Sequence, residues 1–482
     1  MGLAKNSLLY LTATLCIRAT SFFLLPLYSN LVPPDVYGQI YVVSALNNFL
    51  TILLSLSLSI CISRFYFDCT NEQDVKRLYS TILLFVFISS TVIIAPFFLF
   101  NHALSGFLNI SRDYYIYGLI MAYLGIYYQV ILALLYAMQK AKQVSITSMC
   151  VGVFQIVLQL TLVINMEDKA MALLSTMLIQ AITTFIIFIV YSRPYLTFSF
   201  NFKDTGKFVK YSLSQFPSDV SGWLVNFTDR IFINKFIGHA GAGIYGIGAN
   251  IGMIPNMIFS SMNSAFTPYA NSQYKAIEIS DNLQKEKDLR CNLSRVFLIV
   301  SSLLLGVNAV FVAFSRDIVN LLNPAYADAF FVVVVMLFTS LMNSYRVMYM
   351  APLAYNIKYT KVKSLVWVVA GILNISLNYI LIPKYGIYAA CLNSLVTYTI
   401  TFLLMLFFSK KAFYIKYDWS RLIKIACVSI LYGATLLFDS SLIWVGVKLL
   451  LFIPYSYICF KLILKIDIIN YVQVLFKNRL HL

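Results

Sequence analysis

Residues 78–100 of this 482-residue chain read LYSTILLFVFISSTVIIAPFFLF, without one charged side chain. A helix needs about 20 consecutive apolar residues to cross the hydrocarbon core of a bilayer. The rest of the chain has the same character: 60% of its residues are hydrophobic, 11% are charged, and its mean hydropathy is +0.80. A soluble domain carries about 25% charged residues. This composition excludes a water-soluble enzyme, a nucleic-acid-binding domain, a disordered chain and a disulfide scaffold, and predicts a polytopic membrane protein.

The apolar runs predict an all-α polytopic membrane protein with about 14 transmembrane helices. The first run has no small-residue cleavage site, so we expect it to be a retained span. The predicted spans cover residues 7–29, 39–63, 78–100, 114–139, 144–165, 170–191, 209–237, 242–263, 294–314, 329–355, 364–382, 386–408, 422–439 and 442–464.

The basic residues of the connectors are distributed unevenly between the two sides. The chain has 36 Lys and Arg against 19 Asp and Glu, a net charge of +17. About 26 of the 36 fall on one side and about 5 on the other, and cytoplasmic loops carry this excess. We therefore expect both termini in the cytoplasm. The longest connector, residues 264–293, has opposite charges at helical spacing, which indicates a surface helix.

Two short motifs recur six predicted helices apart. Gly152-x-x-Gln155-x-x-x-Gln159 corresponds to Gly371-x-x-Asn374-x-x-x-Asn378, and Val36-Tyr37-Gly38 corresponds to Ile244-Tyr245-Gly246. An even number of helices per half preserves orientation, so we expect two six-helix bundles in parallel pseudo-repeat. The predicted domains are residues 1–208, residues 209–411, and residues 412–482 with helices 13 and 14 and a cytoplasmic tail.

Charged residues inside spans are candidates for function, because each costs about 2.5–3.5 kcal/mol to insert. Arg18 lies near the middle of the first span. In the seventh, Asp219, Asn226 and Arg230 fall within about 20° of one line, a stripe roughly 16 Å long that is too long for Asp219 to pair with Arg230. Asp229 lies beside this stripe.

The tenth span carries Thr339, Asn343 and Arg346 on a second polar face. If Arg18, Arg230 and Arg346 line one cavity, its potential is positive, and we expect an anionic substrate such as a phosphate or pyrophosphate. A cation exporter would instead need acids along the pathway, with aromatic rings. Asp219 and Asp229 are the embedded acids, and both are candidates for carrying a coupling ion.

Structural roles remain open for several of these residues. Asp229 and Arg230 can form a fixed ion pair, and Lys448 is expected to snorkel with its stem in lipid. The Asn and Gln residues of the fifth and eleventh spans more often join helices than touch substrate. Proline interrupts three spans, as a hinge or as a tolerated kink. These prolines are Pro26, Pro217 and Pro255.

Three stretches resemble Wzx-type polysaccharide flippases. YSLSQFPSDVSGWLVNFTDRIFINKFIGHAGAGIYGIGANIGMIPNMIFSSMNSAFTPY (211–269) resembles their seventh and eighth helices. RATSFFLLPLYSNLVPPDVYGQIYVVSAL (18–46) resembles their first hairpin, and KYTKVKSLVWVVAGILNISLNYILIPKYGIYAACLNSLVTY (358–398) their helices 11 and 12. Together they cover roughly a quarter of the chain, in both halves.

The resemblance implies an alternating-access fold shared with multidrug exporters and the lipid II flippase. The implied activity moves undecaprenyl-pyrophosphate-linked oligosaccharide, such as an O-antigen repeat unit, to the outer leaflet of a bacterial cytoplasmic (inner) membrane. The resemblance implies a role in the central cavity for Arg18 and for the pair Asp229–Arg230, by their position in the motif. For Arg346 the same role is inferred only from its place on the polar face of its helix. Family expectations also include antiport of H⁺ or Na⁺, and a polysaccharide polymerase and a chain-length regulator as partners.

Two other functions are alternatives to a flippase. A multidrug or small-solute cation antiporter of the same fold would need acids to dominate the cavity. A membrane enzyme of the same pathway, a polymerase or ligase, would need a large outer loop with catalytic residues, and no outer connector is long. No nucleophile–base pair emerges, and the eight scattered Cys have no metal-ligand spacing. We expect no catalytic residue, no metal, no cofactor and no nucleic-acid partner.

Overall fold

A computed structural model describes residues 24–200, 205–280, 282–356 and 359–464. All regular elements in these ranges are helices, which confirms the prediction of an all-α polytopic membrane protein. Nine of the described helices are long and apolar enough to cross a membrane. The first predicted span lies almost entirely outside the described residues, and so does Arg18; only its end is seen, as α2 (Leu25–Leu31).

The chain divides into two compact units. Unit 1 comprises residues 1–247 and 364–397, and unit 2 comprises residues 248–363 and 398–482. The predicted division at residues 208 and 411 follows the internal repeat, and it stays a prediction.

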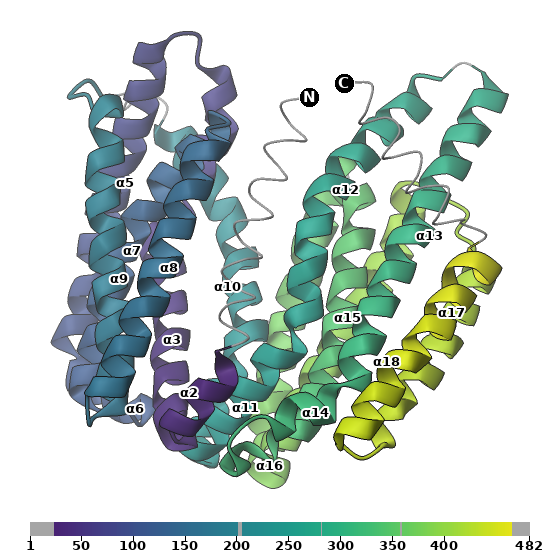
Figure 1. Cartoon of the computed structure of the whole chain (residues 1–482). Coiled ribbons are helices and arrows are strands. Elements are labelled where there is room, and N and C mark those ends of the chain that lie inside the picture. Colours follow the sequence, from purple (N-terminus) through teal and green to yellow (C-terminus); the bar gives the residue numbers. More distant parts are fainter. Residues whose placement is uncertain (1–23, 201–204, 281, 357–358, 465–482) are drawn as a thin grey trace. The chain divides into compact units, whose positions relative to one another are not determined.

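Unit 1 is built from long apolar helices joined by short connectors. In it, α7 packs against α3, α5 and α9, and α8 packs against α9 (Figure 1). Its helices are α3 (Pro34–Ser55), α4 (Ser59–Phe65), α5 (Glu72–Leu99), α6 (Asn101–Leu108), α7 (Arg112–Ala137), α8 (Ala141–Asn165), α9 (Lys169–Ser192) and α10 (Thr205–Phe236), with most of α11 (His239–Gly252) and part of α16 (Thr360–Ala412).

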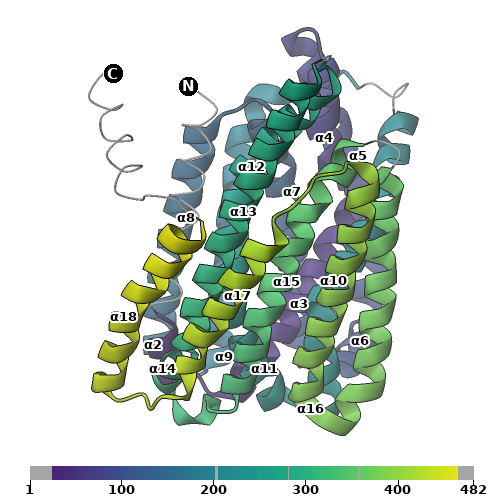
Figure 2. The same cartoon turned by 90° about the vertical axis from the view of Figure 1, so that its right-hand side faces the viewer.

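Unit 2 contains the remaining helices. Here α12 packs against α15 and α13, while α17 lies along α13 with α18 beside it (Figure 2). Its helices are α12 (Ile254–Glu278), α13 (Leu283–Ala313), α14 (Ser315–Asn320), α15 (Ala329–Tyr355), α17 (Trp419–Gly433) and α18 (Leu442–Tyr457).

Two predicted spans differ from the structure. The second predicted span breaks at Leu56 and Ser57, whose φ angles of 45° and 57° end α3 before α4 begins. The eighth is divided into α11 and α12. The eleventh and twelfth share the label α16, but they are separate helices as predicted, divided at Gly386, whose φ of 63° favours glycine. Hydropathy depends on how many consecutive residues are apolar. A break in the backbone inside an apolar run does not change the hydropathy, so the run alone does not reveal the break.

The predicted surface helix between the eighth and ninth spans takes another form. Helix α12 continues to Glu278 and α13 begins at Leu283, so charged extensions of two long helices replace a separate element. The opposite charges stabilise these extensions: the Arg290 guanidinium lies 2.8 Å from the Glu286 carboxylate, at i,i+4 spacing.

The two copies of the Tyr-Gly motif meet inside unit 1. A Cβ atom added at Gly38 of α3 would lie 1.8 Å from the carbonyl oxygen of His239. One added at Gly243 of α11 would lie 1.8 Å from the carbonyl oxygen of Pro34. Helices α3 and α11 therefore touch backbone to backbone, which only glycine allows.

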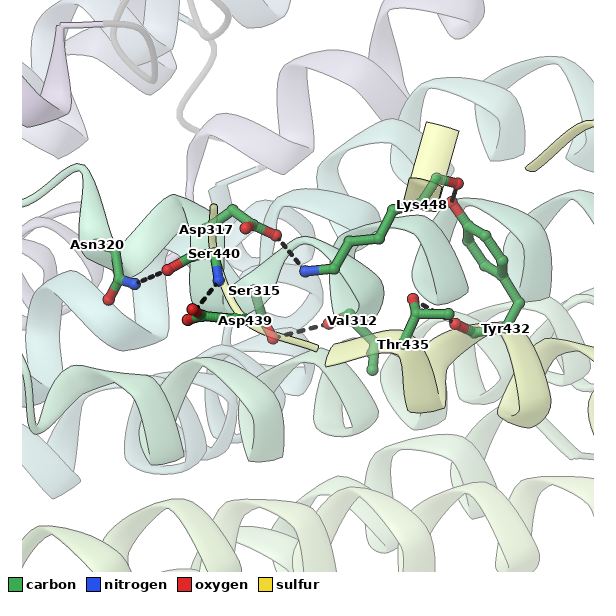
Figure 3. Close-up of polar contacts among 9 residues, drawn as sticks. All are labelled: Val312, Ser315, Asp317, Asn320, Tyr432, Thr435, Asp439, Ser440 and Lys448. Atoms are coloured by element: carbon green, nitrogen blue, oxygen red, sulfur yellow. Dashed lines mark hydrogen bonds and ion pairs between the residues drawn. The ribbon is translucent and has the colours of Figure 1, made fainter. Parts of the chain in front are cut away.

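Lys448 is buried, which corrects the expectation that it snorkels through lipid. Its side chain is 0% exposed, and its Nζ lies 2.5 Å from Oδ2 of Asp317 in α14 (Figure 3). The Tyr432 hydroxyl of α17 donates to the Lys448 carbonyl at 3.3 Å. An ammonium group in an apolar interior needs an anionic partner, and Asp317 lies too far away in the sequence for helical spacing to reveal it.

Gly38→Ala is expected to lower the melting temperature of the purified protein in detergent. The added methyl group forces α3 away from α11, and such overpacking costs about 1–3 kcal/mol. Gly125→Ala in α7 is the matched control, because nothing lies within 4 Å of its added Cβ. An equal loss in both variants would contradict the close approach as the cause.

Lys448→Met is expected to destabilise the protein by about 3–5 kcal/mol, because it leaves the Asp317 carboxylate without its cation. The double variant Lys448→Met/Asp317→Leu removes both charges and is expected to recover most of the loss. Thermal unfolding in detergent measures both, and Lys287→Met, at an exposed lysine of α13, is the control. A double variant no more stable than Lys448→Met would show that the ion pair is not the cause.

Candidate functional site

Helix α10 carries the polar stripe of unit 1. Pro217 lies inside it, and the indole Nε1 of Trp223 donates to the Ala45 carbonyl of α3 at 2.9 Å. The exposed Asn226 side chain donates to the Gly222 carbonyl at 2.6 Å. Arg230 Nη1 donates to the Asn226 carbonyl at 2.8 Å, so these two predicted site residues are in contact.

Arg230 is a half-buried cation. Its guanidinium carbon lies 5.2 Å from the ring centroid of Phe227 and 5.7 Å from that of Tyr41. Its Nε is buried and has no hydrogen-bond partner among the described residues. Within the described ranges, no carboxylate lies within ion-pairing distance of this guanidinium. Its contacts among the described residues are thus aromatic faces and a carbonyl oxygen, with no ion pair.

Asp229 is 3% exposed, and its carboxylate forms hydrogen bonds with groups other than the Arg230 guanidinium. The Tyr245 hydroxyl of α11 donates to its Oδ2, and the Arg230 backbone N–H donates to its Oδ1 at 2.7 Å. Consecutive helical side chains point about 100° apart. Asp229 and Arg230 therefore do not form the fixed ion pair that adjacency in the sequence suggested.

A buried network of amides and hydroxyls lies beside Asp229. Thr228 Oγ1 donates to Asn374 Oδ1 at 3.3 Å, and so does Asn378 Nδ2 at 3.0 Å. Asn393 Nδ2 donates to Asn378 Oδ1 at 2.7 Å, and Asn374 Nδ2 to Thr397 Oγ1 at 3.4 Å. All five side chains are at most 4% exposed. The network joins α10 to both halves of α16, in accord with the role of joining helices expected for the spans' Asn residues.

Sequence reasoning misses four residues of this assembly. These are Thr228, Asn393 and Thr397 of the network, and Tyr245, which the sequence marks only as part of a repeat. Spacing is the available signal for the network: Asn374 with Asn378, and Asn393 with Thr397, are i,i+4 pairs of polar residues in otherwise apolar runs.

The side chain of Asp219 is hydrogen-bonded to Ser57, in the short non-helical segment between α3 and α4. The Ser57 hydroxyl donates to its Oδ2 at 2.6 Å, and Gln215 Nε2 donates to its Oδ1 at 3.3 Å. Ser57 has the left-handed φ angle noted above. The half-buried carboxylate thus fastens α10 to the point where the second span is interrupted.

Arg346 lies in unit 2 and is 6% exposed. Its Nε and Nη2 both donate to Oδ1 of Asn343, at 3.1 and 2.7 Å, and its guanidinium carbon lies 5.9 Å from the Tyr398 ring centroid. The structure therefore brings together Asn343 and Arg346 of the predicted polar face, with Thr339 also buried on the same helix. Arg230 belongs to unit 1 and Arg18 lies outside the described residues, so one cavity shared by the three arginines stays a prediction.

These groups offer a guanidinium without an ion pair among the described residues, and a buried carboxylate that accepts hydrogen bonds from a tyrosine hydroxyl and a backbone N–H. Within the ranges that the structure describes, no group of three or more His, Cys, Asp or Glu could hold a metal ion. The arrangement suits binding of an anion at Arg230 and of a proton or a small cation at Asp229.

Known structures share the fold. The lipid II flippase MurJ, in an inward closed conformation, is 15% identical, with 94% of this chain and 98% of that chain covered and a TM-score of 0.71. A multidrug resistance MATE family transporter of the MOP superfamily, in its inward-facing conformation, is 13% identical, with 85% and 99% covered and a TM-score of 0.61. At these identities, the likeness shows the fold alone.

Sequence comparison identifies the family. No curated protein matches the chain. Residues 3–274 match the family model described as Polysaccharide biosynthesis protein, and this match covers more than half of the 482 residues. The chain therefore belongs to the polysaccharide biosynthesis protein family.

Proposed function

We propose that this protein is a flippase that moves undecaprenyl-pyrophosphate-linked oligosaccharide, such as an O-antigen repeat unit, from the inner to the outer leaflet of the bacterial cytoplasmic membrane. Membership of a polysaccharide biosynthesis family supports a glycan-containing substrate. The fold shared with a lipid II flippase and a multidrug transporter supports translocation by alternating access.

The observation that carries this proposal is the guanidinium of Arg230, which forms no ion pair with a described residue and whose Nε has no hydrogen-bond partner among them. A cation within a predicted span is costly, and it is retained where it meets a partner or lines a pathway. Asp229, the adjacent carboxylate, is held by Tyr245. A substrate pyrophosphate would supply the missing negative charge, and guanidinium groups bind phosphate through a planar fork of donors.

In this mechanism, Arg18, Arg230, Asn226 and Arg346 bind the head group while the glycan occupies an aqueous lumen. The prenyl tail remains in lipid between the bundles. Rocking of the two bundles then opens the lumen to the outer side, with bending at the proline-interrupted helices. The cations must not bind too tightly, because the product has to leave.

Asp229 and Asp219 are the proposed sites of ion coupling. Asp229 is buried, and binding of H⁺ or Na⁺ would change its hydrogen bond with Tyr245 and so the contact between α10 and α11. Loss of the Asp219–Ser57 contact would likewise release α10 from the break after α3. Either event converts an ion gradient into a change in helix packing.

A multidrug or small-solute cation antiporter is the second candidate. The MATE transporter with the same fold favours it. The cations at Arg230 and Arg346 oppose it, because they repel a cationic solute.

The first test uses a strain that lacks this protein, complemented with wild type, Arg230→Ala or the matched control Arg421→Ala. Arg421 of α17 is partly exposed and pairs with Asp418 at 3.2 Å. Surface polysaccharide and the lipid-linked oligosaccharide on the cytoplasmic leaflet are quantified. Wild type and the control are expected to restore export; Arg230→Ala is expected to reduce it about tenfold, as the loss of one charge-assisted hydrogen bond would.

Charge reversal sharpens the result. Arg230→Glu is expected to transport less than Arg230→Ala, since it repels the pyrophosphate. Lipid-linked oligosaccharide unchanged by loss of the protein would overturn the flippase proposal and favour the antiporter. Normal export by Arg230→Ala and Arg18→Ala would remove the pyrophosphate model while leaving flipping intact.

Asp229→Asn is expected to uncouple transport from the ion gradient. The amide keeps the size of the side chain, but it does not bind a proton at physiological pH and has no negative charge to attract Na⁺. Flipping in proteoliposomes is measured with a proton gradient, a sodium gradient or none. Wild type should be stimulated by one gradient, and Asp229→Asn by neither. Asp113→Asn, at an exposed acid in the first turn of α7, is the control; stimulation of Asp229→Asn equal to wild type would contradict the assignment.

A further inference from the structure

An apolar groove of about 480 Å³ lies on unit 1 between α5, α7, α9 and the connector after α9. We call this hollow the apolar groove. Its lining includes Leu83, Leu84, Tyr127, Phe185, Phe188 and Phe198. The Tyr127 ring centroid lies 5.6 Å from that of Phe185 and 5.4 Å from that of Phe188. The Tyr127 hydroxyl is within 3.3 Å of the Ser90 hydroxyl, so the aromatic floor needs no polar partner from a ligand.

Phe198 shows that the apolar groove lacks a cover within the described residues. It belongs to the connector after α9, and its side chain is 98% exposed. Burial of a Phe side chain away from water is favourable. A hydrocarbon chain in the groove would gain this contact together with the aromatic floor.

A charged hollow of about 550 Å³ adjoins the apolar groove, and Phe200 lines both. Its lining carries two cations, Arg77 and Lys207, and two acids. Asp68 lies 3.2 Å from the Arg64 guanidinium, which offsets its charge, whereas Asp74 accepts the neutral Thr70 hydroxyl at 2.9 Å and keeps its charge. The lining therefore has two cations and one acid beside this ion pair.

Arg77 supplies a positive charge that can bind an anionic group. Its Nε donates to the neutral Ser199 hydroxyl at 3.1 Å, and among the described residues no carboxylate forms an ion pair with it. The same end of unit 1 carries further cations in connectors and at the ends of helices. These are Lys76, Lys140, Lys142, Arg193 and Lys210.

We propose that the two hollows form one binding site for an anionic phospholipid, separate from the site on α10. The phosphate lies between Arg77 of α5 and Lys207 of α10, and an acyl chain fills the apolar groove. Basic pockets between membrane helices on the cytoplasmic side bind anionic lipid head groups in this way. Lys207 lies 23 residues before Arg230, about 34 Å along α10, so this lipid does not occupy the proposed substrate position.

The charge pattern selects the occupant. A zwitterionic lipid gains little from Arg77 and Lys207, because its own cation offsets the phosphate. A free phosphate gains nothing from the apolar groove. A lipid with net negative charge places its head group in the charged hollow and an acyl chain in the apolar groove. It thereby links α5 to α10. Its binding to the folded protein stabilises that state by mass action.

The test measures binding of phosphatidylglycerol and of phosphatidylcholine to the purified full-length protein in a neutral detergent, by native mass spectrometry and by thermal shift. Phosphatidylglycerol is expected to bind and raise the melting temperature, and phosphatidylcholine to do neither. The effect should weaken at high salt, because the head-group contacts are ionic.

Two variants and two matched controls locate the site. Arg77→Gln is expected to weaken phosphatidylglycerol binding about fivefold to tenfold. Its control is Arg112→Gln, whose Nε also donates to one neutral acceptor, the Asn101 carboxamide, at 2.7 Å. Leu84→Trp is expected to block the groove with a similar loss, whereas Val92→Trp, at a 66% exposed position of the same helix, is not.

Three results would overturn the proposal: equal binding of the two lipids, equal loss in the variants and their controls, or displacement of phosphatidylglycerol by a lower concentration of polyprenyl phosphate. The last would assign the hollows to a prenyl lipid. None of these readouts depends on flipping, so failure of the lipid site and failure of the proposed function are distinguishable.

Discussion

The hydrogen bond from Tyr245 to the buried carboxylate of Asp229 fastens α10 to α11 in unit 1. Asp229 forms no ion pair with Arg230, its neighbour in the sequence, because consecutive side chains leave a helix in different directions. The guanidinium is left with the Asn226 carbonyl and the rings of Tyr41 and Phe227. The two opposite charges thus have separate partners, although they are adjacent in the sequence.

This separation depends in turn on the close approach of α3 and α11. Gly38 and Gly243 allow the two backbones to touch, and a Cβ at Gly246 would meet the ring of Tyr41. The same contact therefore places Tyr41 beside Arg230 and Tyr245 beside Asp229. Tyr245 belongs to the second copy of the repeated Tyr-Gly motif, and Tyr41 follows the first copy by about one helical turn.

Much of the fold was predictable, because hydropathy depends on local composition. The runs at 78–100, 114–139 and 329–355 match α5, α7 and α15 closely. Helix α10 was less certain from composition: it carries Asp219, Asp229 and Arg230, and it is not among the nine described helices that are apolar enough to be counted as spans. The break at Ser57 escaped prediction, since it arises from φ angles that packing imposes, whereas the break at Gly386 lies where the eleventh and twelfth spans were predicted to meet.

The sequence alone determined that this is a polytopic membrane protein and which charged residues lie within its helices, because apolar length and helical periodicity are local properties. It also determined the stripe on α10 and the polar face of α15. Only the tertiary structure decided the partners of those residues. Ser57 and Asp219 are 162 positions apart, and Asp317 and Lys448 are 131 apart. Such pairs form because particular helices pack together, and no local pattern encodes which helices those are.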